Sequence, residues 1–499
     1  MMSLAVTLVG AAMLLSSMPF STAPGTAMAG GHSSSSSSSS SGAVYKVLAW
    51  NDLGMHCACP TFEGFLLLPP FNTLHAQVYK YGGNDPVVMT QSALTTDKVT
   101  LNYAMVENTD ANLQADPYFA SWIINAPKLF PGFAPVVGGK VIGLAGNGLY
   151  GTMKENTNLL AFEAVGIPAY PIPVTGKNVM TDPLGGSSRD PYLTANVTVK
   201  NSAGTVLAST STVVPVAFGG CCTCHLSLAG SMGYPATPAG SFAALGVMHA
   251  KNTSGINIAM IDPDGDGVGG PVRCSWCHWD PAMGEASAPG WPAATKLLAG
   301  ATFTLKKSTM SFSQVLHKFH NESALVKTYN ANINTDCYAC HPGNGINCYR
   351  GVHKGKTTMV CTDCHGNLTQ RTAANQLANP WLKASLPTCT TPALGITSAF
   401  ACHSRSETGG TVYPANPAFA GSFINGRGHK GSIDCQTCHG SPHAEYPSTL
   451  AADNTGIAAA NSSIAGTVFP AGKDKNYALG VCNYCHPGKT TAWQVVPHN

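Results

Sequence analysis

Cysteine and histidine recur in one arrangement along the last 281 residues of the chain. Six times, two cysteines three positions apart are followed directly by a histidine, in the pattern Cys-x-x-Cys-His. Cysteines at this spacing can lie on one side of a helical turn. There both could form thioethers with the vinyl groups of one haem while the histidine ligates its iron. Zinc sites instead pair Cys-x-x-Cys units without an obligatory histidine, so the pattern predicts c-type haem attachment. The motifs are Cys221, Cys224 and His225; Cys274, Cys277 and His278; Cys337, Cys340 and His341; Cys361, Cys364 and His365; Cys435, Cys438 and His439; and Cys482, Cys485 and His486.

A seventh arrangement is a stretched form of the same pattern. Cys389 is followed by twelve residues and then by Cys402 and His403. The alternative is a disulfide between these cysteines beside an unrelated histidine. Lengthening the closed loop from about 4 to about 14 residues costs only about 1 kcal/mol, so loop entropy permits a haem. The histidine count favours a haem as well, because seven motifs are then matched by seven histidines outside the motifs.

Histidines outside the motifs could supply the second set of iron ligands. Residues 219–499 hold 14 histidines, of which seven belong to the seven motifs. Seven further histidines would close the second face of every iron, and irons closed at both faces pass electrons rather than bind a substrate. The predicted distal ligands are His249, His317, His320, His353, His429, His443 and His498.

A short helix and an internal repeat are expected to position several distal ligands. His317 and His320 lie three apart on one face of a helix predicted within 311–329. We expect them to serve two neighbouring haems, the alternative being a surface helix that carries two histidines. His353 and His429 each lie in a glycine-flanked segment shortly before an attachment motif, and His249 lies in a looser copy.

Two distal ligands lie close to the C-terminal motifs. His443 follows His439 by only four residues, a peptide too short to reach both faces of one iron, so we expect it to serve a different haem. His498 is the penultimate residue, and we expect it to ligate a haem in a neighbouring chain or at the far end of its own chain. His56 and His75 are the competing donors for that role.

The first 218 residues contain no haem motif and divide into three parts. Residues 1–29 carry a short apolar stretch and an Ala-Met-Ala cleavage site, which predicts a secretory signal. Residues 30–42 are a serine-rich linker. Residues 43–218 predict a β-rich, sandwich-like domain, including a strand at 44–50 and a hairpin within 192–216. We expect 219–499 to be a loop-rich, short-helical heptahaem domain.

Composition excludes several classes of function. The net charge is +3, and about 14 haem propionates would bring it to about −11. No basic run is present, so we expect no nucleic-acid partner. No later segment has 18 consecutive apolar residues, so we expect no membrane span. The 53 glycines and 34 prolines fit a loop-rich chain whose apolar core is supplied by porphyrins.

Four cysteines remain outside the motifs: Cys57, Cys59, Cys222 and Cys348. In an oxidising compartment they could form two disulfides with three alternative connectivities. Cys57 and Cys59 are too close in sequence for an unstrained bond to each other. A catalytic cysteine is the weaker alternative.

An acidic segment offers a different kind of site. Asp262, Asp264 and Asp266 alternate along the chain and are followed by Gly267, which resembles the first half of a calcium-binding loop. The position that would hold the bidentate glutamate is Arg273. The alternatives are therefore a Ca²⁺ site and an acidic turn.

The motifs and their matching histidines resemble the outer-surface multihaem c-type cytochromes of metal-respiring bacteria, including those that polymerise into extracellular filaments. The resemblance implies covalent haem c, bis-histidine ligation, a continuous haem chain and extracellular electron transfer. The segments 50–57 and 68–74 resemble a domain fused to such cytochromes. That long non-haem region departs from the compact pattern of filament subunits and so counts against polymerisation.

The expected function is therefore electron relay rather than catalysis. Partners would be other redox proteins, extracellular electron acceptors or further copies joined through haem–haem contacts. We expect a secreted protein at the outer surface or outside the cell, with the periplasm as the alternative. The alternative function is a multihaem reductase with one open iron, but the Cys-x-x-Cys-Lys pattern that often marks such an iron does not occur.

Overall fold

The computed structural model describes residues 44–81, 86–157, 159, 161–173, 180–280, 283–342, 348–349, 359–372, 441 and 443. Several predictions lie outside these residues. They are the signal and linker over 1–42, the motifs of Cys389, Cys402 and His403, of Cys435, Cys438 and His439 and of Cys482, Cys485 and His486, and the distal ligands His353, His429 and His498.

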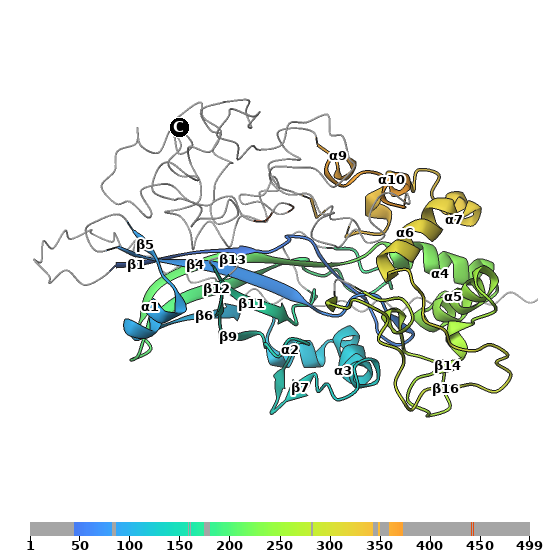
Figure 1. Ribbon diagram of the computed structural model, residues 1–499, viewed down its shortest axis with the longest axis horizontal. Helices are drawn as coiled ribbons and strands as arrows, with labels where there is room; N and C mark the ends of the chain where they lie inside the picture. Colours follow the sequence, from blue (N-terminus) through green and yellow to red (C-terminus); the bar gives the residue numbers. More distant parts are fainter. Residues whose placement is uncertain are drawn as a thin grey trace, which may run out of the picture. The chain divides into compact units, whose positions relative to one another are not determined.

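Two five-stranded sheets make up most of the region from Val44 to Phe218 (Figure 1). The first sheet has the order β1 (Val44–Asn51), β4 (Asn72–Tyr81), β11 (Ala161–Ile167) and β10 (Lys154–Asn156), with β5 (Val87–Val88) beside β4. The second has the order β2 (His56–Ala58), β13 (Val206–Phe218), β12 (Tyr192–Asn201), β6 (Val99–Met105) and β9 (Tyr150–Thr152). Within these sheets, β2 and β13 are parallel and the other neighbours are antiparallel. The predicted β-rich region is confirmed, as are the strand at 44–50 and the hairpin of β12 and β13.

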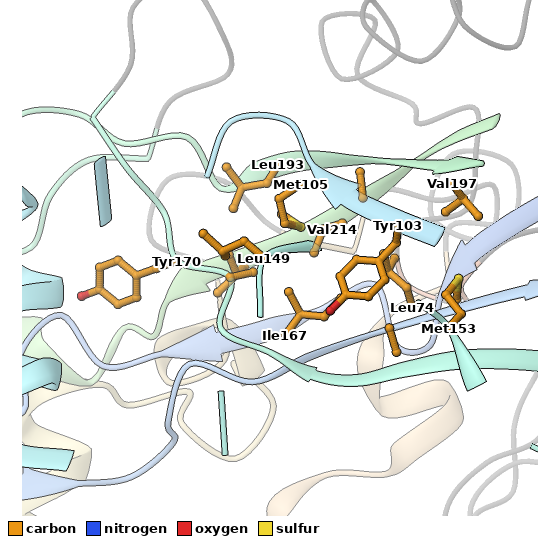
Figure 2. Close-up of a cluster of buried hydrophobic side chains, with 14 of the residues drawn as sticks. Leu74, Tyr103, Met105, Leu149, Met153, Ile167, Tyr170, Leu193, Val197 and Val214 are labelled. Atoms are coloured by element: carbon orange, nitrogen blue, oxygen red, sulfur yellow. The ribbon is translucent and has the colours of Figure 1, made fainter. Parts of the chain in front are cut away.

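Side chains from both sheets share one hydrophobic core (Figure 2). Leu74 of β4 and Ile167 of β11 meet Val197 of β12 and Val214 of β13 there, and all four are fully buried. Alternate residues of a strand point to the same face, which explains why the apolar positions of β12 gather on this side. Burying each such side chain contributes about 1.5–3 kcal/mol.

A buried ionic cluster fixes helix α3 (Pro117–Leu129) to the core of this region. Arg189 Nη1 lies 2.8 Å from Asp116 Oδ2, and its Nε lies 3.3 Å from Asp182 Oδ2. Asp116 also caps α3 by accepting the backbone N–H groups of Tyr118 and Phe119, each at 3.0 Å. The guanidinium lies 4.2 Å from the centre of the Tyr118 ring. Charges buried this deeply are retained only when they are paired and hydrogen-bonded.

Short helices predominate over strands in the described residues after Phe218. The helices are α4 (Cys221–Ser231), α5 (Pro238–Asn252), α6 (Phe312–Glu322), α7 (Ala324–Tyr329), α9 (Cys361–His365) and α10 (Leu368–Thr372), with the 3-10 turns η1 (Ile258–Met260), η2 (Cys274–Trp276) and η4 (Cys337–Ala339). Small elements complete the described chain: α1 (Gln91–Thr96), α2 (Asp110–Ala115), β3 (Phe65–Leu66), β7 (Val136–Val137), β8 (Lys140–Val141), β14 (Ile261–Asp262), β15 (Val272–Arg273) and β16 (Lys296–Leu297). Within the described ranges, none of the helices combines the length and the apolar composition needed to cross a bilayer.

The helix predicted within 311–329 is divided at Ser323 into α6 and α7. Ser323 ends α6 in an extended conformation, and its side chain accepts the backbone N–H of Val326 to begin α7. Serine favours this capping role over the interior of a helix. His317 and His320 both lie within α6, so the break leaves their predicted spacing intact.

Candidate functional site

Four of the predicted haem motifs lie within the described residues, and each begins at a helical turn. Cys221 opens α4 directly after β13, Cys274 opens η2, Cys337 opens η4 and Cys361 opens α9. Residues three apart lie on one side of such turns. The local backbone therefore provides the arrangement of two cysteines that thioether attachment requires.

Each of these motif histidines has one of the predicted distal histidines as a neighbour. The pairs are site 1 (His225 and His320), site 2 (His278 and His249), site 3 (His341 and His317) and site 4 (His365 and His443). The ring centres lie 6.5 Å apart in site 2, 6.3 Å in site 3 and 6.0 Å in site 4. In site 1, the charge of His320 acts together with burial to lower the pKa of His225.

The distances between the ring centres match those expected for two imidazoles that share one metal ion. A metal–nitrogen bond is about 2 Å long and the ring centre lies about 1 Å farther on, so two axial imidazoles have centres about 6 Å apart. The three measured spacings are close to this value. The interplanar angles are 70°, 22° and 15°, a variation that axial ligation allows because each ring can rotate about its bond to the metal.

Contacts at Nδ1 orient the predicted distal histidines that the structure describes. For His249, His320 and His443 the acceptors are the backbone carbonyls of Ile256, Leu316 and Leu53, at 2.8, 2.7 and 2.8 Å. A carbonyl can only accept, so Nδ1 carries the proton and Nε2 of the neutral ring keeps its lone pair. The Nδ1 atom of His317 lies 3.3 Å from Ser313 Oγ. Such bonds orient metal-ligating histidines in proteins.

Burial keeps these rings in the neutral form that binds metals. It lowers the pKa of His225 to about 4, with the charge of His320 as the second cause. Burial is likewise the largest cause of a lowered pKa at His249, His278, His320, His341 and His443. The Nδ1 atom of His225 is buried without a hydrogen-bond partner among the described residues.

Sites 1 and 3 lie next to each other. Their distal ligands are three residues apart on α6, and the backbone N–H of Gly220 donates to the carbonyl of Cys340 at 3.1 Å. The Sγ of Cys221 lies 3.9 Å from the same carbonyl. A side chain at Gly220 would collide with the carbonyl of Ala339, so glycine permits the close approach of the two motifs.

Site 4 lies next to site 3, and site 2 lies next to site 1. The thiol of Cys361 is close enough to that of Cys337 to be the largest cause of its raised pKa, which places the motif of site 3 near that of site 4. At the other end, α5, which carries His249, packs against α4, which carries the motif of site 1. The four sites therefore follow one another in the order 2, 1, 3 and 4.

The β-rich region contributes to two of these sites, which the motifs in the sequence did not indicate. The two residues of β3 pair in parallel with β15, which directly precedes Cys274. Phe242 of α5 stacks on Phe65 of β3 with ring centres 6.1 Å apart. Both elements that carry the ligands of site 2 therefore rest on β3. In site 4, the carbonyl of Leu53 accepts the hydrogen bond from Nδ1 of His443.

The turn that presents Leu53 is itself held by side chains. Asn51 Oδ1 accepts the N–H of Gly54 at 2.6 Å, and Asp52 Oδ1 accepts that of Leu53 at 2.7 Å. Gly54 has a φ of +73°, a conformation that glycine adopts without strain. Because the atom that contacts His443 is a backbone oxygen, no residue type at this position could have indicated the contact.

His56 and His75, the competing donors, have other partners. His56 Nε2 lies 2.7 Å from Asp52 Oδ1, and His75 Nε2 lies 3.9 Å from Glu163 Oε2. Both rings therefore direct Nε2 at a carboxylate. The prediction for His498 lies outside the described residues.

The predicted calcium ligands are brought together, but a lysine contacts them. The ligand atoms of Asp262, Asp264 and Asp266 lie within 4.8 Å of one another. Lys128 Nζ lies 2.7 Å from Asp264 Oδ2 and 2.9 Å from Asp266 Oδ2. Asp262 accepts backbone N–H groups of its own loop, including that of Gly265 at 2.7 Å. The ammonium group thus provides a positive charge where Ca²⁺ was predicted, and the Ca²⁺ site stays a prediction.

The chain matches no protein-family profile, no curated protein and no solved structure.

Proposed function

We propose that the protein is a multihaem c-type cytochrome that relays electrons along a chain of bis-histidine haems. The observation that carries this proposal is that a predicted distal histidine lies near each of the four described motif histidines. Ring contacts join three of the pairs, in sites 2, 3 and 4. In site 1, His320 is close enough to His225 to lower its pKa, as His443 also does for His341. The ring spacings and the hydrogen-bonded Nδ1 atoms support the same conclusion.

Each part of a site has a separate role in the proposal. The two cysteines of a motif hold the cofactor covalently, the motif histidine is the proximal ligand, and the second histidine is the distal ligand. Haem c, when bound, supplies reversible one-electron chemistry at its iron. With two histidine ligands for each iron, the chain would leave no coordination position open to a substrate. This is the arrangement of a carrier rather than of a reductase.

The contacts between sites support a relay. Sites 1, 3 and 4 are joined by direct contacts between their motifs, and α6 carries distal ligands of two of them. Adjacent cofactors give short electron-transfer steps. The three motifs outside the described residues would extend the chain to seven haems.

Location and partners follow from the sequence in this proposal. The signal at 1–29 would export the chain, and c-type haem would be attached outside the cytoplasm. The partners would then be redox proteins or electron acceptors at the outer surface, with the periplasm as the alternative location. Assembly of copies through haem–haem contacts would extend the relay between chains.

Spectroscopy of the purified full-length protein tests this proposal. We expect seven covalent haems per chain by alkaline pyridine haemochrome, all low-spin, with no binding of carbon monoxide by the folded reduced protein. Six haems would remove the stretched motif of Cys389, Cys402 and His403. A high-spin iron that binds carbon monoxide would instead favour the reductase. A haem-free protein from a host able to mature c-type cytochromes would refute the proposal.

A further inference from the structure

Site 4 differs from the other described sites in where its distal histidine is anchored. The Nδ1 atoms of His249, His317 and His320 contact atoms that lie four or seven residues away in sequence. The Nδ1 atom of His443 instead donates to the carbonyl of Leu53, 390 residues away in sequence, at 2.8 Å. The orientation of this ring therefore depends on how the β-rich region holds Leu53.

One peptide group connects His443 to the side chain of Asn51. The carbonyl of Leu53 and the N–H of Gly54 belong to the same peptide. Its carbonyl accepts from His443, and its N–H donates to Asn51 Oδ1 at 2.6 Å. Hydrogen bonds in such a chain polarise one another, so a peptide that donates through its N–H is a stronger acceptor at its carbonyl. Asn51 therefore strengthens the bond that His443 makes.

Asn51 is itself held by partners in both sheets. It is the last residue of β1 and is buried, and its Nδ2 donates to Asn72 Oδ1 at 2.5 Å and to the carbonyl of Thr73 at 2.9 Å. Asn72 is fully buried at the start of β4, and its Nδ2 donates to the carbonyl of Pro215 in β13 at 3.0 Å. Because both amide hydrogens of Asn51 have acceptors, its oxygen is the atom that faces Gly54.

We propose that Asn51 is a positioning residue for site 4 and lowers the reduction potential there by holding the Leu53–Gly54 peptide against His443. This inference rests on the proposed function, because it takes His443 as an axial ligand of haem. A stronger bond at Nδ1 makes an imidazole more basic at Nε2. A more basic ligand favours the oxidised iron, which carries the greater positive charge. The β-rich region would then set the potential at one end of the described sites.

A redox titration of the purified full-length holoprotein, followed by electron paramagnetic resonance, tests this role. The low-spin signal that is lost in His443→Ala identifies site 4. Asn51→Leu has a similar size but no amide. We expect it to lower the ratio of oxidised to reduced iron at site 4 about threefold at a fixed solution potential. That change is about 30 mV for one electron, at about 59 mV per tenfold.

Asn108→Leu is the matched control. Asn108 is also buried, and its side chain both donates to the carbonyl of Tyr170 and accepts the N–H of Tyr170, each at 2.9 Å. Its loss should destabilise the β-rich region without changing the ratio at site 4. An unchanged ratio in folded Asn51→Leu would overturn the inference. An equal change in the two variants would do the same, because Asn51 would then act only through stability.

Hydrogen exchange in the wild-type protein gives a second test, which holds even if Asn51→Leu does not fold. Oxidation of the iron makes its imidazole ligand a stronger donor, which should strengthen the bonds along the chain to Gly54. By thermodynamic linkage, the peptide that spans residues 51–55 should exchange about threefold more slowly in the oxidised protein than in the reduced protein. Mass spectrometry measures both rates, with the peptide around Tyr170 as the control. Equal rates in the two states would refute the role of Asn51.

The failure of this inference is distinguishable from the failure of the relay. If His443→Ala leaves every iron low-spin, His443 is not a ligand, and the role of Asn51 falls while the relay stands. A holoprotein with its expected haems but with no effect of Asn51→Leu gives the same division. A haem-free protein would overturn both.

Discussion

The region from Val44 to Phe218 and the described region after it are stabilised in different ways. In the first, two sheets enclose one large apolar core (Figure 2), and the buried charge of Arg189 is paired. In the second, the described apolar cluster has five buried members, among them Phe242 and Trp276. Its helix α7 buries no residue, nor does α9. The second region is instead rich in closely spaced histidines and cysteines.

The proposal of haem explains this contrast. A porphyrin is a large apolar plate, and covalent attachment near a helical turn places it where side chains would otherwise form a core. With haem bound, the motif region would depend on its cofactors, whereas the core of the β-rich region is made of its own side chains.

Withholding haem should have the largest effect. When the chain is expressed where c-type attachment cannot occur, we expect proteases to cleave between Gly219 and Thr372 about 100-fold faster than in the holoprotein, because about 3 kcal/mol of lost stability raises the open population by that factor. Limited proteolysis followed by mass spectrometry measures the rates. Cleavage within β12 and β13 should change far less. Equal resistance of the haem-free motif region would show that side chains alone hold it.

Substituting Arg189→Met should perturb the opposite region. The change leaves Asp116 and Asp182 buried without their cation, and removing one partner of a buried ion pair costs about 3–5 kcal/mol. Chemical denaturation followed by tryptophan fluorescence measures the loss. The control is Lys154→Met at an exposed strand position, which should change stability by less than about 0.5 kcal/mol. A loss below about 1 kcal/mol for Arg189→Met would mean that the cluster is unimportant to this fold.

Sequence predicted what depends on local spacing and missed what depends on tertiary contact. The alternation of apolar residues that predicts β12 and β13 can be recognised within each strand. The spacing of Cys221 and Cys224 can likewise be recognised within α4 alone. The assignment of His320 to site 1 and of His317 to site 3 is not local, since each motif comes from another segment. The carbonyl of Leu53 has no sequence signal at all, because every residue type provides one.

Removing one distal ligand tests the pairing with a smaller effect on stability. His320→Ala should convert one of the proposed haems to a high-spin form that binds carbon monoxide, because the proposal gives His320 to one haem only, as its distal ligand. Electron paramagnetic resonance and the carbon monoxide difference spectrum measure the fraction converted. The control His56→Ala should leave every iron low-spin, since the Nε2 atom of His56 is hydrogen-bonded to the carboxylate of Asp52. A high-spin haem in the control would mean that the β-rich region supplies a ligand and that the division of histidines is wrong.

The smallest expected change in stability concerns a surface ion pair between β4 and the residue that follows α1. Lys80 Nζ lies 2.7 Å from Asp97 Oδ2, and the hydroxyl of Tyr45 donates to Asp97 Oδ2 at 2.8 Å. These hydrogen bonds hold the pKa of Asp97 below its ordinary value of 3.8. A carboxylate with a lowered pKa adds stability above its unfolded pKa and loses that contribution as the pH falls through its folded pKa.

Asp97→Asn should therefore destabilise the protein at pH 7 by less than about 1 kcal/mol, as expected for a solvent-screened pair. The difference from wild type should shrink as the pH falls below about 3.8, where Asp97 itself becomes protonated. Urea denaturation at several pH values measures both, with Glu63→Gln at an exposed site as the control. A difference that stayed constant down to pH 2 would show that the asparagine perturbs packing rather than charge. The haem spectra should be the same in all three proteins, because the Lys80–Asp97 pair belongs to the β-rich region, which contains no haem motif.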